Sequence, residues 1–364
     1  MVTTKVVTAF AVEVLDPRNA AEPEGWRGFL RRSRLWPVWE YEVLRREAWL
    51  AKNPPVLAVI RRRGKVAGAL TVMVCRSWRA TDFAPMSVFG GRFRPRWAEA
   101  YLWQLSGYPA CVLDERLDDA ERRQAIRRFE QALRTHLGPG LLGVIYRAMN
   151  PELLPAMEGR GRVSREIDPA AVLLNTYFTV DDWERGLGDE PRETLRGLRV
   201  DEDLRTEVAP ARRDLDVHEL SALLNAHRAR QDDRAWAEGQ RSRIGGLHMD
   251  TRSPIAPSYL DALVRRPDVV TLTYRDGSGR LLGFGTLFDA EEGCALHQWA
   301  ALPSAGGGRK GLYVDFYARG VEHMIVNRRP ELTAGRAMLA DKAALGFGTR
   351  ALVSVAVPRP VLGR

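Results

Sequence analysis

The sequence predicts a mixed α/β protein built from two related halves. Its 364 residues are enough for two hydrophobic cores. Runs of β-forming residues alternate with helical patterns along the whole chain. The plan of residues 55–70, which is a proline, an apolar strand, a polar glycine turn and a strand with an internal glycine, recurs at 267–285. Because the two copies lie about half the chain apart, duplication is the simplest explanation, although a common hairpin plan can also recur by chance.

Composition is that of a soluble globular protein, with 45% hydrophobic and 28% charged residues. No apolar run approaches the roughly 18 residues of a transmembrane helix, and the N-terminus lacks a signal-peptide pattern. The three cysteines (Cys75, Cys111 and Cys294) are far apart and form no CxxC pair, so we expect neither a zinc site nor a disulfide framework. These features predict a cytoplasmic protein.

The net charge of +9 is compatible with an RNA partner. Only five of the 55 basic residues are lysines, however, and arginine and alanine are abundant throughout. This bias is typical of a GC-rich genome, so the charge alone favours nucleic-acid binding only slightly.

In the first half, residues 25–50 form a helical pattern that Pro37 divides in two. Its four tryptophans are expected to pack against a sheet, although stacking on bases is an alternative. Residues 94–105 and 118–136 are predicted to be helices, and residues 110–113 are predicted to be a short strand. The other predicted strands of this half cover 5–15, 56–61, 66–74, 83–93 and 141–146.

In the second half, Thr179 is a predicted helix N-cap, and Arg192, Arg196 and Arg199 fall on one face of the helix that follows. Residues 232–257 are polar and long enough to cover a substrate as a loop. The predicted helices cover 217–230, 258–266 and 312–327, and the predicted strands cover 172–178, 204–208, 269–274, 281–287 and 294–302.

A glycine-rich basic loop, 303–311, lies between the last of these strands and the helix at 312–327. Glycines let backbone N–H groups approach a ligand, and a helix N-terminus favours negative charge. The loop is therefore a candidate anion site, with a tight basic turn as the alternative.

Three pieces in this order resemble the GNAT acyltransferase superfamily in its tandem, Fem-like (FemAB-like) form. They are the segment 177–208 with its arginine-bearing helix, the hairpin and strand at 269–302, and the late glycine of 332–347 followed by Lys342-Ala-Ala-Leu-Gly-Phe. The resemblance covers about the last half of the chain, whereas the first half matches only in plan.

The resemblance implies two GNAT-like lobes, 1–170 and 171–364, each a mixed, mostly antiparallel sheet flanked by helices, with the active site in the second. It implies an N-acyltransferase in which an amine attacks an activated acyl group and the protein stabilises the oxyanion. No cofactor or metal is required. The co-substrate of Fem-type enzymes is aminoacyl-tRNA, and the acceptor would be the amine of a cell-wall precursor or of a small metabolite.

Two alternatives stay open. GNAT enzymes that use acyl-CoA often carry Arg/Gln-x-x-Gly-x-Gly/Ala before the central helix, whereas this chain has Gly306-Gly307-Gly308-Arg309-Lys310 at a different spacing. The spacing favours aminoacyl-tRNA over acyl-CoA as the donor. The second alternative is a GNAT-like protein that binds RNA or peptidoglycan without turnover.

Candidate donor-binding residues are Gly307, Gly308, Arg309 and Lys310 in the loop, and Arg336 after Gly335. The resemblance places Lys342 near a phosphate or the forming oxyanion, and a surface lysine is the alternative.

His297 is a candidate base in mid-strand, where alternation puts it on one face with Ala295 and Trp299; a core histidine is as plausible. His227, Arg228 and Arg196 are candidate acceptor-binding residues, against a simple role at helix ends and on a solvated face. The oligomeric state is not predicted.

Overall fold

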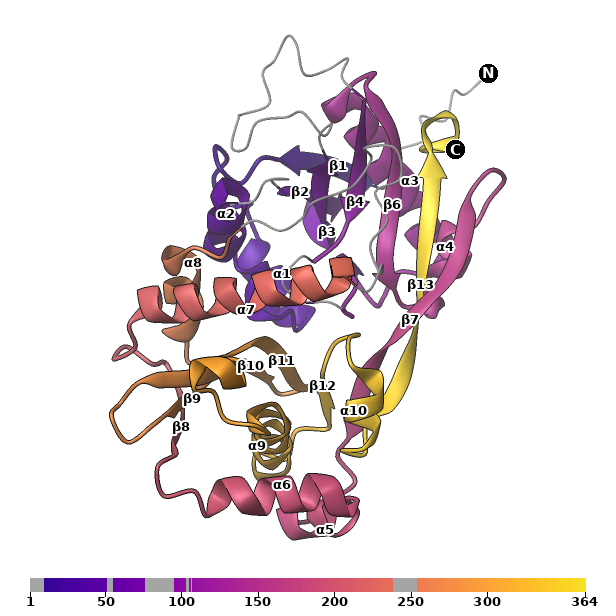
Figure 1. The fold of residues 1–364 in the computed structure, drawn as a ribbon. Coiled ribbons are helices and arrows are strands. Elements are labelled where there is room, and N and C mark those ends of the chain that lie inside the picture. The colour runs from indigo at the N-terminus through magenta and orange to yellow at the C-terminus, as the bar shows by residue number, and fades with distance from the viewer. Residues whose placement is uncertain (1–9, 51–54, 76–94, 103–104, 106, 238–253) are drawn as a thin grey trace, which may run out of the picture.

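The structure is a computed structural model, and it describes residues 10–50, 55–75, 95–102, 105, 107–237 and 254–364. Helices and strands alternate, as predicted, in a mixed α/β fold (Figure 1). The first half contains β1 (Phe10–Leu15), α1 (Trp26–Arg32), α2 (Tyr41–Leu50), β2 (Pro55–Arg62), β3 (Lys65–Cys75), β4 (Arg96–Ala100), β5 (Cys111–Leu113), α3 (Asp119–Leu137), β6 (Leu141–Met149), α4 (Leu154–Met157) and β7 (Val163–Leu174).

The second half begins with two short helices where one was predicted: Thr179 caps the first through a capping box, and the arginine face lies on the second. Its elements are α5 (Val180–Arg185), α6 (Asp189–Arg199), β8 (Arg205–Pro210), α7 (Val217–Ala237), α8 (Pro257–Val264), β9 (Val269–Arg275), β10 (Leu281–Ala290), β11 (Gly293–Ala301), α9 (Leu312–Val326), β12 (Glu331–Thr333), α10 (Leu339–Ala343) and β13 (Gly348–Pro358).

Strand order shows how the two halves are related. The sheet of the described residues runs β1-β2-β3-β4-β6-β13-β7-β12-β11-β10-β9-β8. Read from either end, it gives an antiparallel meander and then a parallel pair, β4 with β6 in one half and β11 with β12 in the other. The hairpins β2–β3 and β9–β10, which carry the predicted repeat, occupy matching places.

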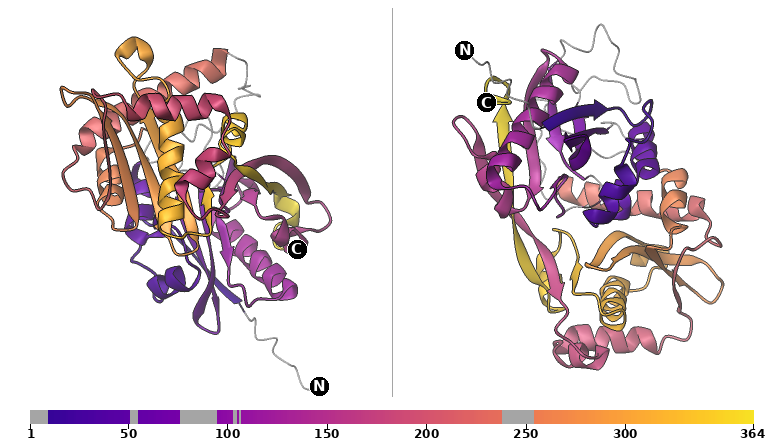
Figure 2. Two further views of the ribbon diagram at one scale, coloured as in Figure 1. Left: turned by 90° about the horizontal axis from the view of Figure 1, so that it is seen from below. Right: turned by 180° about the vertical axis from the view of Figure 1, so that it is seen from behind.

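The last strand of each half pairs with the other half. β7 is antiparallel to β12, and β13 returns to pair with β6. β7 and β13 also pair with each other, and Figures 1 and 2 show them running side by side between the two halves. The division into two lobes, 1–170 and 171–364, stays a prediction. Its boundary at residue 170 falls inside β7.

One hydrophobic core joins the first half to one face of the second-half sheet. It includes Phe29 and Phe129 from the first half together with Leu220 of α7, Leu260 of α8 and Phe284 of β10. A second core lies on the other face of that sheet, under α9, around Phe316 and Val321. The second-half sheet is therefore covered on one face by α7 and on the other by α9 (Figure 1).

Several expectations need correction. The helix expected at 94–105 is wrong for its described part: β4 occupies 96–100, because its backbone pairs with β3 on one side and β6 on the other, while residues 94, 103 and 104 lie outside the described residues. Residues 232–237 continue α7 rather than starting a loop. The strand expected at 172–178 starts earlier, at Val163, and ends at Leu174.

The expectations for residues 5–9, 83–93 and 238–253 lie outside the described residues. The predicted packing of the tryptophans is confirmed for Trp26 and Trp39, which are both 1% exposed, and is wrong for Trp49, whose side chain at the end of α2 is 55% exposed. No helix within the described ranges is long and apolar enough to cross a membrane.

Candidate functional site

The parallel strands β11 and β12 separate along most of their length. β11 has nine residues, but only Cys294 and Ala295 pair with the three-residue β12. From Leu296 to Ala301 the edge of β11 that faces β12 is open. We call this opening, bounded by residues 296–301 of β11 and by the end of β12 at Thr333, the wedge.

A β-bulge lies within the wedge. The register of β11 with β10 shifts between Gly285 and Leu287, so two residues of β11, His297 and Gln298, lie opposite one residue of β10, Thr286. The extra residue reverses the alternation of side chains. His297 therefore stacks on Phe288 of the first core, with ring centroids 4.3 Å apart, whereas Trp299 stacks on Phe316 of α9 at 5.0 Å.

The expectation that His297 and Trp299 share a face is wrong for this reason. His297 Nδ1 lies 3.1 Å from Thr286 Oγ1, and burial lowers the pKa of His297 to about 3. Its imidazole is therefore neutral at physiological pH and too weak a base to take a proton from an ammonium group efficiently. These contacts favour the core-histidine alternative, and a catalytic role for His297 stays a prediction.

The bulge leaves a backbone donor in the wedge. Because Leu302 N donates to Leu282 O, the pairs Ala301–Gly283 and Trp299–Gly285 are of the non-hydrogen-bonded kind. The amides of Trp299 and Ala301 consequently point away from β10, toward the wedge. Within the described ranges the Trp299 amide has no hydrogen-bond partner, so it is available to a ligand oxygen.

Helix α7 crosses the end of the wedge at Ala301. His227 Nδ1 lies 3.3 Å from both the amide nitrogen and the carbonyl oxygen of Ala301, and Arg230 donates to the same carbonyl at 2.7 Å. Burial lowers the pKa of His227 below its usual 6.5, so the neutral form dominates at pH 7. Among the predicted acceptor residues, His227 is the one that the structure brings to the wedge.

Arg228 and Arg196 lie elsewhere. Arg228 is half-buried, and its charge acts on Tyr259 of α8. Arg196 is exposed on α6. Its neighbours on this face bind other parts of the protein. Arg192 donates to the carbonyl oxygen of Leu187 at 2.6 Å, and Arg199 donates to the carboxylate of Glu184.

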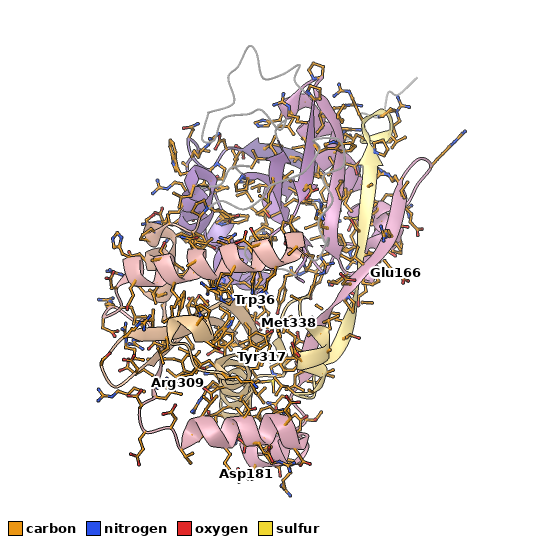
Figure 3. The ribbon with its side chains drawn as sticks, in the orientation of Figure 1. Trp36, Glu166, Asp181, Arg309, Tyr317 and Met338 are labelled. Carbon is orange, nitrogen blue, oxygen red and sulfur yellow. The ribbon has the colours of Figure 1, made fainter. Side chains whose placement is uncertain are left out.

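The glycine loop packs tightly beside the wedge. A Cβ at Gly308 would lie 2.1 Å from the carbonyl oxygen of Leu302, and Gly307 has a positive φ of 83°. Arg309 is paired with Asp201, at 3.3 Å, and with Asp203, and it lies toward the outer edge of the second half (Figure 3). The expected phosphate role of Arg309 therefore competes with two carboxylates.

Lys310 lines a cavity of about 540 Å³ between α6, the start of α9 and α10. Its walls include Glu190 and Glu193 of α6 and Asp341 of α10. Tyr313 also lines it, and the Tyr313 ring contacts Trp299 with centroids 5.9 Å apart. The cavity, which we call the α9 pocket, therefore adjoins the wedge through this aromatic pair.

Lys342 is buried on the β12 side of the wedge. It is 2% exposed, and its Nζ donates to the carbonyls of Ala334 and Ala337, in the segment that follows β12. Burial lowers the pKa of Lys342 to about 8. The surface-lysine alternative is wrong, and the contacts give Lys342 a positioning role for the segment 334–337.

Arg336 is not near Lys310. It donates to the backbone oxygen of Asp168 at 2.9 Å and lines a second cavity, of about 690 Å³, together with Arg147 and Arg165 on β6 and β7. The structure thus brings Gly308, Lys310, His227 and Lys342 around the wedge and the α9 pocket. Sequence reasoning missed Trp299 and Arg230, whose roles come from backbone direction and from packing between distant elements.

Comparisons with known proteins agree on the fold. No family model and no curated protein matches the sequence. The chain superimposes on L-PGS from Bacillus licheniformis with 11% identity and a TM-score of 0.56 over 96% of this chain and 98% of the other.

Two further solved structures are similar. The C-terminal domain of a putative lysylphosphatidylglycerol synthetase from Agrobacterium fabrum has 12% identity and a TM-score of 0.56 over 91% of each chain. FemX has 10% identity and a TM-score of 0.54 over 94% of this chain and 96% of the other. The chain therefore shares the fold of FemX and of the two lysylphosphatidylglycerol synthetase structures.

Proposed function

We propose that the protein is an N-acyltransferase that moves an aminoacyl group from aminoacyl-tRNA to an amine acceptor, with the reaction in the wedge. One observation carries the proposal: beyond Ala295 the edge of β11 that faces β12 is unpaired among the described residues, and its Trp299 amide is directed into the opening. A backbone N–H held in this way stabilises the oxyanion that forms when an amine adds to an acyl carbon.

The roles of the surrounding groups follow. The acceptor, which is an ammonium ion at neutral pH, loses a proton to neutral His227, and the free amine attacks the ester carbonyl carbon of the donor. The Trp299 amide donates to the resulting oxyanion. The intermediate then collapses: the bond from the carbonyl carbon to the ribose oxygen breaks, the proton lost by the attacking nitrogen passes to that oxygen, and an amide bond remains. Ala301, which His227 contacts, and Trp299 are two residues apart on β11, a separation of about 6.6 Å along a strand. His227 therefore lies on the same side of the wedge as the carbonyl carbon held at Trp299.

The donor is assigned to the α9 side. Lys310 and the N-terminus of α9 supply local positive potential at one wall of the α9 pocket. The terminal phosphates of the donor would lie at this wall, away from the carboxylates of Glu190, Glu193 and Asp341 on the other walls. The Fem-like resemblance and the altered glycine spacing favour aminoacyl-tRNA as this donor. The acceptor enters from the α7 side, and a wall precursor or a small metabolite would both supply the amine.

An acyl-CoA donor is the second candidate, because a glycine loop before α9 and Lys310 would also suit a pyrophosphate group. A binding protein without turnover is the third. The experiment offers radiolabelled aminoacyl-tRNA or acyl-CoA with a panel of amines, with and without ribonuclease. The proposal predicts transfer from aminoacyl-tRNA that ribonuclease abolishes. Turnover of CoA thioesters that ribonuclease does not affect would contradict it.

A further inference from the structure

A cluster of metal-ligating side chains lies at the closed end of the wedge, away from the proposed reaction. Asp289 ends β10, Cys294 begins β11, and the two are paired residues of one hairpin. His323, in the last turn of α9, lies over them. One oxygen, one sulfur and one nitrogen of these residues all lie within 4.8 Å of one another. Spacing along the sequence does not reveal this cluster, because a sheet register and a helix bring it together.

The separations from the Asp289 carboxylate to the other two side chains are close to those of a tetrahedral site, and the three ligand atoms all lie within 4.8 Å of one another. Cys294 Sγ is 3.7 Å from Asp289 Oδ1, and His323 Nε2 is 3.3 Å from Asp289 Oδ2. Ligands at bond lengths of about 2.3 Å for sulfur and about 2.0 Å for nitrogen or oxygen lie roughly 3.3–3.6 Å apart around a tetrahedral zinc ion. The side chains therefore need little movement to close on a cation.

His323 is already oriented. The Asn327 side chain lies 3.2 Å from His323 Nδ1 and also donates to the His323 carbonyl at 2.8 Å, which turns Nε2 toward the cluster. The buried Nε2 lies 3.3 Å from Asp289 Oδ2 without the geometry of a hydrogen bond. The Asn327 amide nitrogen is a donor, so Nδ1 accepts from it and the neutral ring carries its proton on Nε2. Cation binding at Nε2 therefore moves the ring proton to Nδ1, where the Asn327 side chain must turn to accept it.

Arg329 shares the Asp289 carboxylate. It donates from Nε to Oδ1 at 2.7 Å and from Nη2 to Oδ2 at 3.1 Å. An ionised carboxylate has about four acceptor positions, so Arg329 leaves positions for a cation on the same group. It also partly neutralises a site in which a thiolate and a carboxylate would meet.

We propose that Asp289, Cys294 and His323 bind a thiophilic divalent cation of the zinc class. Thiolate and imidazole ligands select such an ion over magnesium or calcium, and three protein ligands leave a fourth position for water. Binding replaces the thiol proton of Cys294 and any proton on His323 Nε2. The ion fastens the β10–β11 hairpin to the end of α9 at the point where β11 and β12 are still paired, and so stabilises the closed end of the wedge.

Cobalt(II) added to the chelator-treated full chain is the probe. The proposal predicts one bound ion per chain, with thiolate-to-cobalt charge-transfer absorption and the intense visible bands of a tetrahedral complex, which zinc then removes. Cys294→Ser should abolish the charge-transfer band, while Cys111→Ser, which changes the other buried cysteine of the described residues, should keep it. His323→Gln is the second variant if Cys294→Ser does not fold, and should weaken cobalt binding at least about tenfold.

Three results would each overturn the proposal. They are the absence of cobalt absorption in the wild-type chain, a charge-transfer band that survives in Cys294→Ser, and a cobalt affinity that His323→Gln leaves unchanged. None depends on acyl transfer, so the metal site and the proposed function are tested separately.

Discussion

The two parallel strand pairs of the molecule occupy matching places but differ in one respect. β4 pairs with β6 through all five of its residues, from Arg96–Leu141 to Ala100–Tyr146. β11 pairs with β12 through two residues and is then open. The first-half pair thus satisfies its backbone groups internally, whereas in the second-half pair the Trp299 amide points away from β10 and meets no acceptor among the described residues. The same strand plan supports structure in one half and a candidate reaction centre in the other.

The largest expected effect comes from obstructing the wedge beside the loop. Gly308→Ala places a Cβ 2.1 Å from the Leu302 carbonyl oxygen, so the loop must shift away from the end of β11. A misplacement of about 1 Å near reacting groups costs roughly 100-fold in rate. We expect that loss in kcat/KM for aminoacyl transfer.

Gly306→Ala is the matched control for Gly308→Ala. Its Cβ would meet only the Pro303 ring at 3.4 Å, so its activity should stay near the wild-type value. Equal activities for the two variants would mean that the loop does not define the site.

His227→Ala should lower kcat by roughly 100-fold or more, because it removes the proposed proton acceptor. The pKa of His227 is depressed, so the wild-type rate should be independent of this group at pH 7 to 8 and should fall only as the pH drops below 6.5. The pH–rate profile of both proteins is the measurement. His218→Ala, an exposed position at the start of the same helix, is the control, and a wild-type rate in His227→Ala would exclude the imidazole as the base.

Lys342→Met tests the β12 side of the wedge. It leaves the carbonyls of Ala334 and Ala337 without their donor, at a cost of about 1–3 kcal/mol in the free energy of unfolding. This side of the wedge also loses its anchor, so we expect about a tenfold loss of activity. Denaturant unfolding and kinetics measure the two effects, with the exposed Lys65→Met as control. A loss of activity without any loss of stability would instead favour a direct catalytic role.

The smallest effect on activity is expected in the first half. Burial raises the pKa of Glu47 on α2 from 4.5 to about 8. The folded state therefore favours the protonated acid, and stability is lost as the pH rises from the unfolded value of 4.5 toward 8. Glu47→Gln should unfold with about 3 kcal/mol more free energy than wild type at pH 7 and with little difference at pH 4.5. Unfolding curves at the two pH values check this, and transfer activity should not change.

Local chemistry explains which parts of this molecule could be predicted. Asp118 and Glu121 form a capping box at the start of α3, and runs of β-forming residues predict β9 and β10, which are buried on both faces along most of their length. β4 was not predicted because its identity depends on two partner strands that are distant in sequence. The wedge depends on the shortness of β12 and on a bulge opposite Thr286, and neither has a local residue pattern.

The same distinction applies to the site. Gly308, Lys310, His227 and Lys342 could be named because loop, helix and family patterns mark them. The exchange of β7 and β13 between the halves, which moves Arg336 to the other cavity, follows from the topology of the whole chain. So does the position of Arg230 at the end of β11.

Amide hydrogen exchange at Trp299 and Ala98, followed by NMR in the free protein and with bound donor, tests the central comparison most directly. Ala98 pairs on both sides, with Val74 and Val144, so its amide should exchange slowly in both states. The Trp299 amide should exchange much faster in the free protein and slow when donor binds in the wedge. Equal protection of the two amides in the free protein, or no change at Trp299 on saturation with donor, would contradict the account.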